Sequence, residues 1–363
     1  MLLKGKFLYG EDYELKEGVL VVEDNEIKGF TNEHGEYKNI GLAIPGLINL
    51  HTHIADNCIK DVGINIPLDD LVKPPNGLKH IYLSKVSREE LLEAIKDGLK
   101  ELIDNGINIF CDFREGGVEG VNILKEALKD FNIKSFILGR PTYEGERVLE
   151  VSDGYGLSGA NEYGDKELKN LYKECKKEDK IFSLHAAEHV GAVKYSLDKY
   201  GMTEIERIIN LNIKPNFIIH ATHLTENDSY LLEKYNIPVV LCVRSNLYYN
   251  VGMPDIGKIK TLKALGTDNF MANSPSIFRE MEFLFKLYHL EPKEILKMAT
   301  INGAKILNLK RVGLIEEGYK PYFTFIDPNV IRFSKNVIAS IILRTEKGDI
   351  LRTTMRLFTT LLV

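Results

Sequence analysis

The sequence of 363 residues predicts an α/β protein: a (β/α)8 barrel of the TIM type, with a small β-sandwich built from both ends of the chain. Between about residues 43 and 318, short continuous apolar runs alternate with longer stretches of helical spacing, which is typical of parallel strands covered by helices. Shorter runs at both ends of the chain indicate further strands. Histidines and an aspartate follow several central runs, at the strand ends where such barrels carry their active sites.

The two ends of the chain share a strand-like pattern with polar and glycine-containing turns between the strands. Near the N-terminus the runs lie at residues 6–9, 18–23 and 26–30. Near the C-terminus they lie at residues 322–327, 337–343 and 349–355. We therefore predict a composite β-sandwich domain of residues 1–45 and 319–363, beside a barrel domain of residues 46–318.

The central region supplies eight candidate strands. They lie at residues 44–51, 107–113, 134–139, 154–158, 181–185, 217–220, 238–242 and 264–268. The segments between them have helix signals: Ser87 is followed by Glu90 three residues later, a capping pattern, and Pro292 stands where a helix tolerates proline. Strands that alternate with helices in this way favour a closed parallel barrel.

Composition limits the partners of the chain. The formal net charge is −5 and no Lys/Arg-rich block occurs, so neither nucleic acid nor an anionic membrane is indicated. No apolar run reaches the roughly 18 residues that span a bilayer, and the N-terminus does not have the pattern of a signal peptide. The four cysteines are scattered, without a C-x-x-C pair. We expect a cytoplasmic protein with reduced cysteines.

A group of candidate metal ligands follows the apolar runs. His51 and His53 end the first long run, and residues two apart in a strand point to the same side. His185, His220 and Asp268 each end a later run. A single histidine there is more simply a capping or turn residue, and H-x-H alone is a weak motif. The placement of the whole set at separate strand ends favours one metal site at the barrel mouth.

The ligand types suggest which metal binds. Imidazole and carboxylate without thiolate suit Zn²⁺ or Fe²⁺ with one position left for water, so we predict one divalent metal ion, with Zn²⁺ preferred and Fe²⁺ as the alternative. Such an ion lowers the pKa of its bound water toward about 7. Glu188, three residues after His185, is the candidate that moves protons. The alternative is a first-turn glutamate stabilised by a helix dipole.

Seven motifs connect these residues to a known family. They lie at residues 44–53, 185–188, 220–224, 242–247, 265–269, 299–305 and 313–318. In these motifs the chain resembles the amidohydrolase superfamily over nearly its whole length. Within that superfamily it is similar to the branch of cytosine, guanine and S-adenosylhomocysteine deaminases and of the triazine and other chlorohydrolases.

The resemblance implies roles for individual residues. It implies metal ligation by His51, His53, His185 and Asp268. It implies catalytic roles for Glu188, His220 and Asp268: Glu188 protonates a ring nitrogen and later the leaving group, His220 polarises the attacked centre, and Asp268 takes a proton from the metal's water. His223 aligns with a second histidine of the sixth strand that more often packs than ligates. Residues 153–159 lack the lysine that bridges two metals in some relatives, which favours a single metal.

The activity implied is hydrolytic deamination of a small amino-substituted heterocycle, of purine, pyrimidine or pterin type, by metal-bound hydroxide. The alternative is a hydrolase that opens cyclic amide or imidazolone rings. A third hypothesis, a non-catalytic relative that keeps only the barrel, fits poorly because all six ligand and catalytic residues are present. The expected partner is a small-molecule substrate, and the resembled family also makes a homo-oligomer a candidate assembly.

Five further residues are candidates for contacting substrate because they follow strands at the predicted mouth. They are Arg114, Arg140, His223, Arg244 and Asn246. An arginine there could clamp a carboxylate or phosphate, or it could pair with a neighbouring carboxylate instead. Residues 71–80 have the composition of a loop over the mouth. The segments 141–153 and 246–265 are shorter than in typical relatives, so substrate rules of the family need not transfer.

Overall fold

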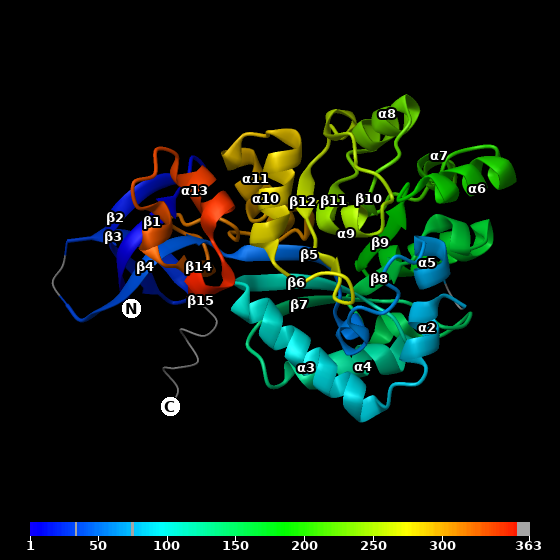
Figure 1. The fold of residues 1–363 in the computed structure, drawn as a ribbon, viewed down its shortest axis with the longest axis horizontal. Coiled ribbons are helices and arrows are strands. Elements are labelled where there is room, and N and C mark those ends of the chain that lie inside the picture. The colour runs from blue at the N-terminus through cyan, green and yellow to red at the C-terminus, as the bar shows by residue number, and fades with distance from the viewer. Residues whose placement is uncertain (33–34, 74–75, 354–363) are drawn as a thin grey trace.

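The computed structural model describes residues 1–32, 35–73 and 76–353, and it arranges them around two sheets (Figure 1). The larger sheet has nine strands in the order β12-β11-β10-β9-β8-β7-β6-β5-β13, and all neighbours in it are parallel. The strands are β5 (Leu47–His53), β6 (Ile107–Arg114), β7 (Lys134–Gly139), β8 (Gly154–Leu157), β9 (Ile181–Ala186), β10 (Phe217–His220), β11 (Val239–Leu241), β12 (Lys263–Leu265) and β13 (Asp268–Asn269).

The sheet closes into a barrel at its eighth strand. The predicted run 264–268 is divided into β12, which pairs with β11, and β13, which pairs with β5. The two edges of the sheet are therefore consecutive in the chain, and β12 also contacts β5. Gly266 lies at this junction, where a Cβ would stand 2.6 Å from the Cβ of His51. The predicted barrel is confirmed, and the close approach explains why the junction requires glycine.

Helices cover the barrel and connect its strands. They are α1 (Leu68–Val72), α2 (Leu78–Leu83), α3 (Arg88–Asp104), α4 (Gly117–Leu128), α5 (Asp165–Lys177), α6 (Val190–Tyr200), α7 (Glu204–Asn210), α8 (Glu226–Tyr235), α9 (Val243–Tyr248), α10 (Ile277–Tyr288), α11 (Pro292–Met298) and α12 (Ile301–Ile306). As predicted, the Ser87 side chain accepts from the Glu90 amide at 3.1 Å and starts α3. The prediction that residues 71–80 form a loop is wrong at its ends, which belong to α1 and α2.

The smaller sheet brings the two ends of the chain together. Its order is β15-β14-β4-β1-β2-β3, antiparallel except between β1 and β4. The strands are β1 (Leu2–Tyr9), β2 (Glu14–Glu23), β3 (Glu26–Thr31), β4 (Tyr37–Pro45), β14 (Phe323–Ile326) and β15 (Ile350–Thr353). We keep the domain limits, 1–45 with 319–363 and 46–318, as a proposal, and residues 354–363 lie outside the described part of the chain.

One predicted strand of this domain is wrong. Residues 337–343 form most of a helix, α13 (Val337–Arg344), which packs against α10 and α11. The Asn336 side chain accepts from the Ala339 amide at 3.0 Å and caps the helix. A short run of isoleucine and valine does not distinguish a strand from a buried helix, and here the cap and the neighbouring helices decided.

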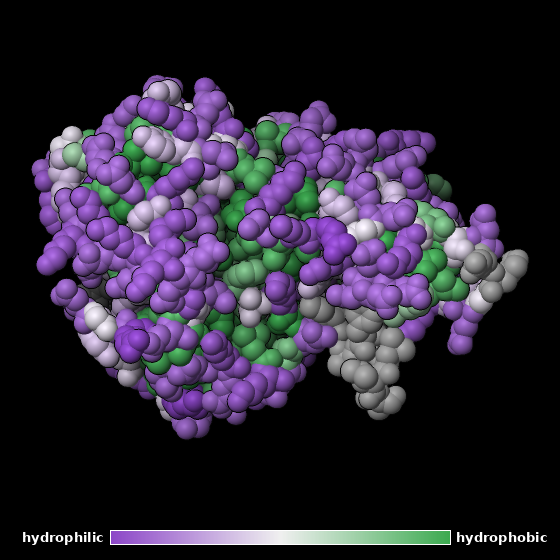
Figure 2. Space-filling model, turned by 180° about the vertical axis from the view of Figure 1, so that it is seen from behind, coloured by the Kyte–Doolittle hydropathy of each residue, from purple (hydrophilic) through white to green (hydrophobic). Residues whose placement is uncertain are grey.

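The surface of the molecule is largely hydrophilic on the face drawn in Figure 2. Hydrophobic residues show there mainly in the recesses between the hydrophilic ones. No helix in the part of the chain that the structure describes is both long and apolar enough to cross a lipid bilayer. All four cysteines are free, as the sequence predicted.

Candidate metal centre and active site

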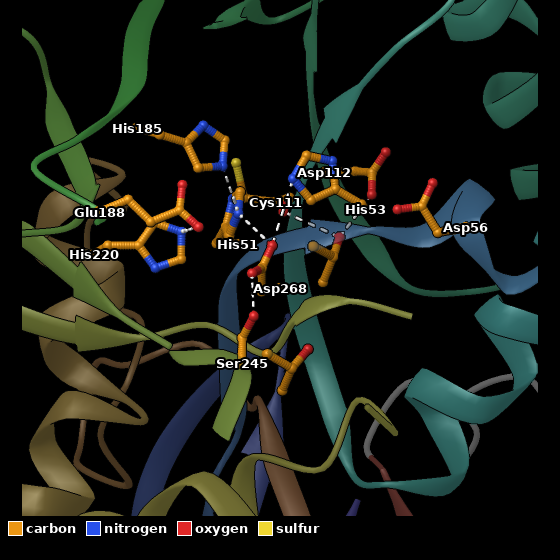
Figure 3. Close-up of polar contacts among 12 residues, drawn as sticks. His51, His53, Asp56, Cys111, Asp112, His185, Glu188, His220, Ser245 and Asp268 are labelled. Atoms are coloured by element: carbon orange, nitrogen blue, oxygen red, sulfur yellow. Dashed lines mark hydrogen bonds and ion pairs between the residues drawn. The ribbon is translucent and has the colours of Figure 1, made fainter. Parts of the chain in front are cut away.

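The predicted ligands converge on one end of the barrel. His51 and His53 end β5, His185 is the penultimate residue of β9, His220 ends β10 and Asp268 starts β13. Figure 3 shows their imidazoles grouped around the Asp268 carboxylate, with Ser245 on its other side. Parallel strands carry their C-terminal ends to a common edge, which is why residues far apart in the sequence meet here.

Four of these side chains can share a single cation. One ligand atom each from His51, His185, His220 and Asp268 lies within 4.8 Å of the others, and all four residues are buried. Nε2 of His51 is 3.1 Å from Oδ1 of Asp268 and 3.2 Å from Nε2 of His185. The predicted ligand His53 lies beside this group, with its Nε2 3.5 Å from the same Asp268 oxygen. His220, predicted as a catalytic residue and not as a ligand, thus belongs to the group of four that can share a cation.

The backbone is unusual at two of the site residues. His220 has a φ of +72° and Asp268 a φ of +59°, in the left-handed region that residues other than glycine rarely adopt. Such a conformation costs on the order of 1–3 kcal/mol and persists where the surrounding structure enforces it. This conformation occurs at the last residue of β10 and the first residue of β13, where the two side chains meet at the barrel mouth.

Neighbouring polar groups orient the ligands. Nδ1 of His185 lies 2.9 Å from the Leu157 carbonyl oxygen, and Nδ1 of His220 lies 2.9 Å from Oδ1 of Asn246. Each Nδ1 therefore carries the proton and donates, which leaves Nε2 with a lone pair toward the centre. The Ser245 hydroxyl donates to Oδ2 of Asp268 and leaves Oδ1 toward the histidines. Asn246, predicted to contact substrate, contacts His220 in this way.

The charge state of the group fits a bound cation. Burial lowers the pKa of His51, His53 and His185, so these imidazoles are neutral at pH 7. Burial opposes ionisation of Asp268, but its hydrogen bond with His51 and the nearby imidazoles hold its pKa well below the ordinary value. The Nε2 atoms of His51 and His185 lie 3.2 Å apart, beside the Asp268 carboxylate. Nε2 of His220 is buried without a hydrogen-bond partner in the described chain. A divalent cation satisfies all of these atoms at once.

A carboxylate lies beside the centre, as predicted. Oε1 of Glu188 is 3.5 Å from Nε2 of His220. Glu188 is two residues beyond β9 and precedes His189, the N-cap of α6. It is therefore not a first-turn residue of that helix, and the alternative explanation based on the helix dipole loses its basis.

A cavity opens above these side chains. Its volume is about 60 Å³, and its walls include His53, Glu115, Arg140, Glu188, Tyr249 and Asp268. An outer cavity of about 180 Å³ adjoins it and shares five wall residues. The shared residues are Leu68, Val72, Ser158, His185 and Glu188. A small ring thus has space at the centre, with more room outward along Glu188.

One wall of the inner cavity is a buried ionic network that the sequence did not predict. Nζ of Lys79, a residue of α2, is 2.7 Å from Oδ2 of Asp56 and 3.1 Å from Oε1 of Glu115. Nη1 of Arg140 is 2.9 Å from the same Glu115 oxygen. The Lys79 side chain is 2% exposed. The sequence signal for Lys79 was its position near the end of the predicted loop over the mouth.

The predicted substrate contacts do not all reach this cavity. Arg140 is part of its wall. Arg114, by contrast, donates from Nε to the Gly120 carbonyl oxygen, and Nε2 of His223 is 2.6 Å from the Val251 carbonyl oxygen. Arg244 donates to the Ser274 carbonyl oxygen and to Asn273, and it lies 3.5 Å from Glu280. None of these three is among the wall residues of either cavity in the described chain.

A (β/α)8 barrel with neutral imidazoles and a carboxylate converging at its mouth is the architecture of a hydrolase that uses a divalent cation. The model of the amidohydrolase family matches residues 42–355. The chain belongs to the amidohydrolase family, and it is an enzyme of this hydrolase type.

Similar proteins agree with this assignment. An uncharacterized protein of Methanocaldococcus jannaschii is 59% identical over 366 residues, which cover 96% of each chain. Among solved structures, an adenosine deaminase of Xanthomonas campestris with bound zinc has a TM-score of 0.82 at 17% identity, over 96% of this chain and 90% of that chain. A guanine deaminase of E. coli has a TM-score of 0.80 at 17% identity, over 97% of each chain. At this identity the two structures establish the fold.

Proposed function

We propose that the protein is a deaminase that hydrolytically removes the amino group from a small heterocycle of purine, pyrimidine or pterin type. The observation that carries this proposal is the position of Glu188. Its carboxylate lies 3.5 Å from Nε2 of His220, on the wall of a cavity that also contains the group of candidate metal ligands. A proton donor and a cation site thus face the same small space.

The proposed cofactor is one zinc ion, with iron(II) as the alternative. His51, His53, His185 and Asp268 are the proposed ligands, and His220 reaches the same centre. Nitrogen and oxygen donors without thiolate suit both metals, and the bound zinc of the Xanthomonas campestris adenosine deaminase favours zinc. A single ion is proposed because β8, Gly154–Leu157, offers no lysine. When bound, such an ion supplies Lewis-acid activation of a water molecule.

Two residues, Asp268 and Glu188, would handle the protons of the reaction, and His220 would orient the attacked ring. Asp268, through Oδ1, accepts the proton that the attacking water loses as its oxygen bonds to the amino-bearing ring carbon. Glu188 donates a proton to the adjacent ring nitrogen. As the new C=O bond forms, Glu188 takes the remaining proton of the water oxygen and passes it to the amino group, which leaves as ammonia, and the proton on Asp268 then returns to Glu188. Asn246 fixes the ring of His220 beside the attacked carbon. The attacked carbon ends as a carbonyl that carries the water oxygen, and the adjacent ring nitrogen keeps its proton.

The names of similar proteins favour deamination over ring opening. The similar structures act on adenosine and guanine by name, which are amino heterocycles. Opening of a cyclic amide uses the same proton transfers and stays the alternative. A cytoplasmic location and a homo-oligomeric state stay predictions of the sequence.

Two measurements test the proposal. The purified protein is analysed for bound zinc and iron, and ammonia release is measured on a panel of aminopurines, aminopyrimidines, aminopterins and lactams. We expect about one divalent ion per chain, and ammonia release that falls by about 10²–10⁴-fold in Glu188→Gln. Glu144→Gln, on an exposed glutamate, serves as the matched control.

The panel separates the alternatives. Hydrolysis of a lactam without ammonia release from any amino heterocycle refutes deamination and favours the ring hydrolase. A chain that takes up no divalent ion under any loading condition refutes both the deaminase and the ring-hydrolase hypotheses and leaves the hypothesis of a non-catalytic barrel.

A further inference from the structure

Tyr249 is a buried residue of the inner cavity to which neither the sequence analysis nor the proposed reaction gives a role. It follows α9 and is 8% exposed. Its hydroxyl is buried and makes no hydrogen bond to the described part of the chain. Burial raises the pKa of this phenol, as do the charges of Asp268 and Asp56, so it is neutral and able to donate. Buried hydroxyl groups nearly always have a partner, which indicates that one arrives with the ligand.

Arg140 presents a second polar group to the same cavity. Its Nη1 is 2.9 Å from Glu115, and its Nε is 3.4 Å from the Gly156 carbonyl oxygen. Its Nη2 has no hydrogen-bond partner among the residues that the structure describes. Lys79 also binds Glu115, so the guanidinium is held from one side by a carboxylate that is itself fixed. The free edge can only donate, and a charge-assisted bond favours an oxygen that carries negative charge.

The two groups line the same inner cavity from distant parts of the chain. Arg140 directly follows β7, and Tyr249 comes after β11, which lies four strands further along the sheet order. Glu188 follows β9 and His220 ends β10, and both also line this cavity. A ring that touches both Arg140 and Tyr249 there therefore lies beside Glu188.

We propose that Arg140 and Tyr249 recognise the substrate from the wall of the inner cavity, and that this substrate is an amino heterocycle that also carries an acceptor oxygen. The inference rests on the proposed function and specifies its substrate class. The oxygen is either a ring carbonyl or a carboxylate substituent, since both accept from a guanidinium. Rings with an amino group and no such oxygen leave the Arg140 edge without a partner and bind more weakly.

The test compares substrates that differ by one oxygen. With the zinc-loaded protein, kcat and KM are measured for cytosine against 4-aminopyrimidine and for isoguanine against adenine. The carboxylate source is probed with 4-aminopyrimidine-2-carboxylate. We expect kcat/KM to be at least 10-fold higher for each oxygen-bearing substrate that the enzyme turns over than for its analogue without that oxygen. Calorimetric binding of uracil against 4-pyrimidinone, neither of which has an amino group, gives a readout that does not depend on turnover.

Variants locate the recognition. Arg140→Met is expected to lower kcat/KM and uracil affinity by about 10–150-fold, the range of hydrogen bonds to charged groups, while leaving 4-aminopyrimidine nearly unchanged. Tyr249→Phe is expected to lower them by about 2–12-fold. Tyr248→Phe, on the neighbouring exposed tyrosine, is the matched control and should have no effect. Arg140→Lys keeps the charge without the planar fork, so it measures recognition if the methionine variant folds poorly.

The outcomes separate this inference from the deaminase proposal. Deamination that is equally fast with and without the oxygen, and unchanged in both variants, overturns the recognition pair and leaves the deaminase intact. Oxygen-dependent binding that both variants weaken supports the pair even if no ammonia is released. Failure of every oxygen-bearing ring to bind the zinc-loaded protein overturns the inference.

Discussion

Replacement of Lys79 by methionine tests the buried ionic network beside the active site. Lys79 binds Asp56 at 2.7 Å and Glu115 at 3.1 Å, and the Lys79 and Asp56 side chains are 2% and 1% exposed. Methionine keeps the apolar stem and removes the charge, which leaves Asp56 buried without its cation. Removing one partner of such a pair typically destabilises a protein by about 3–5 kcal/mol. We expect a loss within that range in the free energy of unfolding at pH 8, because Glu115 still has Arg140 at 2.9 Å.

The matched control removes both charges. Lys79→Met combined with Asp56→Asn leaves no unpaired charge at Asp56, and replacing a buried pair by neutral groups is often close to neutral. We expect the double variant to recover most of the loss, with a coupling energy of roughly 2–3 kcal/mol. Urea unfolding followed by circular dichroism gives these values, with the midpoint and slope compared across the unaltered protein, Lys79→Met, Asp56→Asn and the double variant.

The sign of the pH dependence provides a second readout. Burial raises the pKa of Asp56 to about 7 in the intact protein, although Lys79 opposes that shift. Without Lys79 the pKa rises further. A carboxyl group whose pKa is higher in the folded than in the unfolded state stabilises the fold at low pH, and this stability is lost as pH rises through the folded-state value. The deficit of Lys79→Met should therefore shrink from pH 8 to pH 5. A deficit below about 1 kcal/mol, or a double variant as unstable as the single one, would refute the reasoning.

Three further predictions follow from single contacts. Asn246→Ala removes the acceptor that orients His220 and should lower kcat/KM for ammonia release by about 10–100-fold, whereas unchanged kinetics would argue against the orienting role. Gly266→Ala places a methyl group 2.6 Å from the Cβ of His51 and should reduce the free energy of unfolding by about 1–3 kcal/mol, measured in urea; a neutral result would mean that the junction can relax. Burial raises the pKa of Glu280 to about 7 from 4.5, so stability should decline by up to about 3 kcal/mol between pH 5 and pH 8, and Glu280→Gln should lack this decline in thermal unfolding curves.

The ligand set illustrates how far local pattern reaches. His51 and His53 could be assigned to one site because a strand directs alternate residues to the same side. The apolar runs before His185, His220 and Asp268 made each a strand end, and a parallel barrel gathers such ends. Which imidazoles group with Asp268 depends on small shifts between strands. The sequence therefore could not predict that His220 belongs to this group, and only the tertiary structure shows it.

The arginines illustrate the opposite case. Arg114, Arg140 and Arg244 lie at or just after the ends of strands, and no local pattern separates them. Only packing turned Arg140 into the cavity and paired Arg244 with Glu280. The prediction of a strand at residues 337–343 was wrong for a related reason. An apolar segment of seven residues fits a strand or a helix, and the elements that pack against it decide which one forms.

The sequence alone determined the barrel, the convergence of histidines and an aspartate at its mouth, and the family, because period and strand-end position are local properties of the chain. The tertiary structure decided the rest: the division of the eighth strand at Gly266, the pairing of His220 with Asn246, the Lys79 network, and the burial of the Tyr249 hydroxyl. Each of these depends on which side chains from distant segments share a space, and that is fixed by packing rather than by the order of residues.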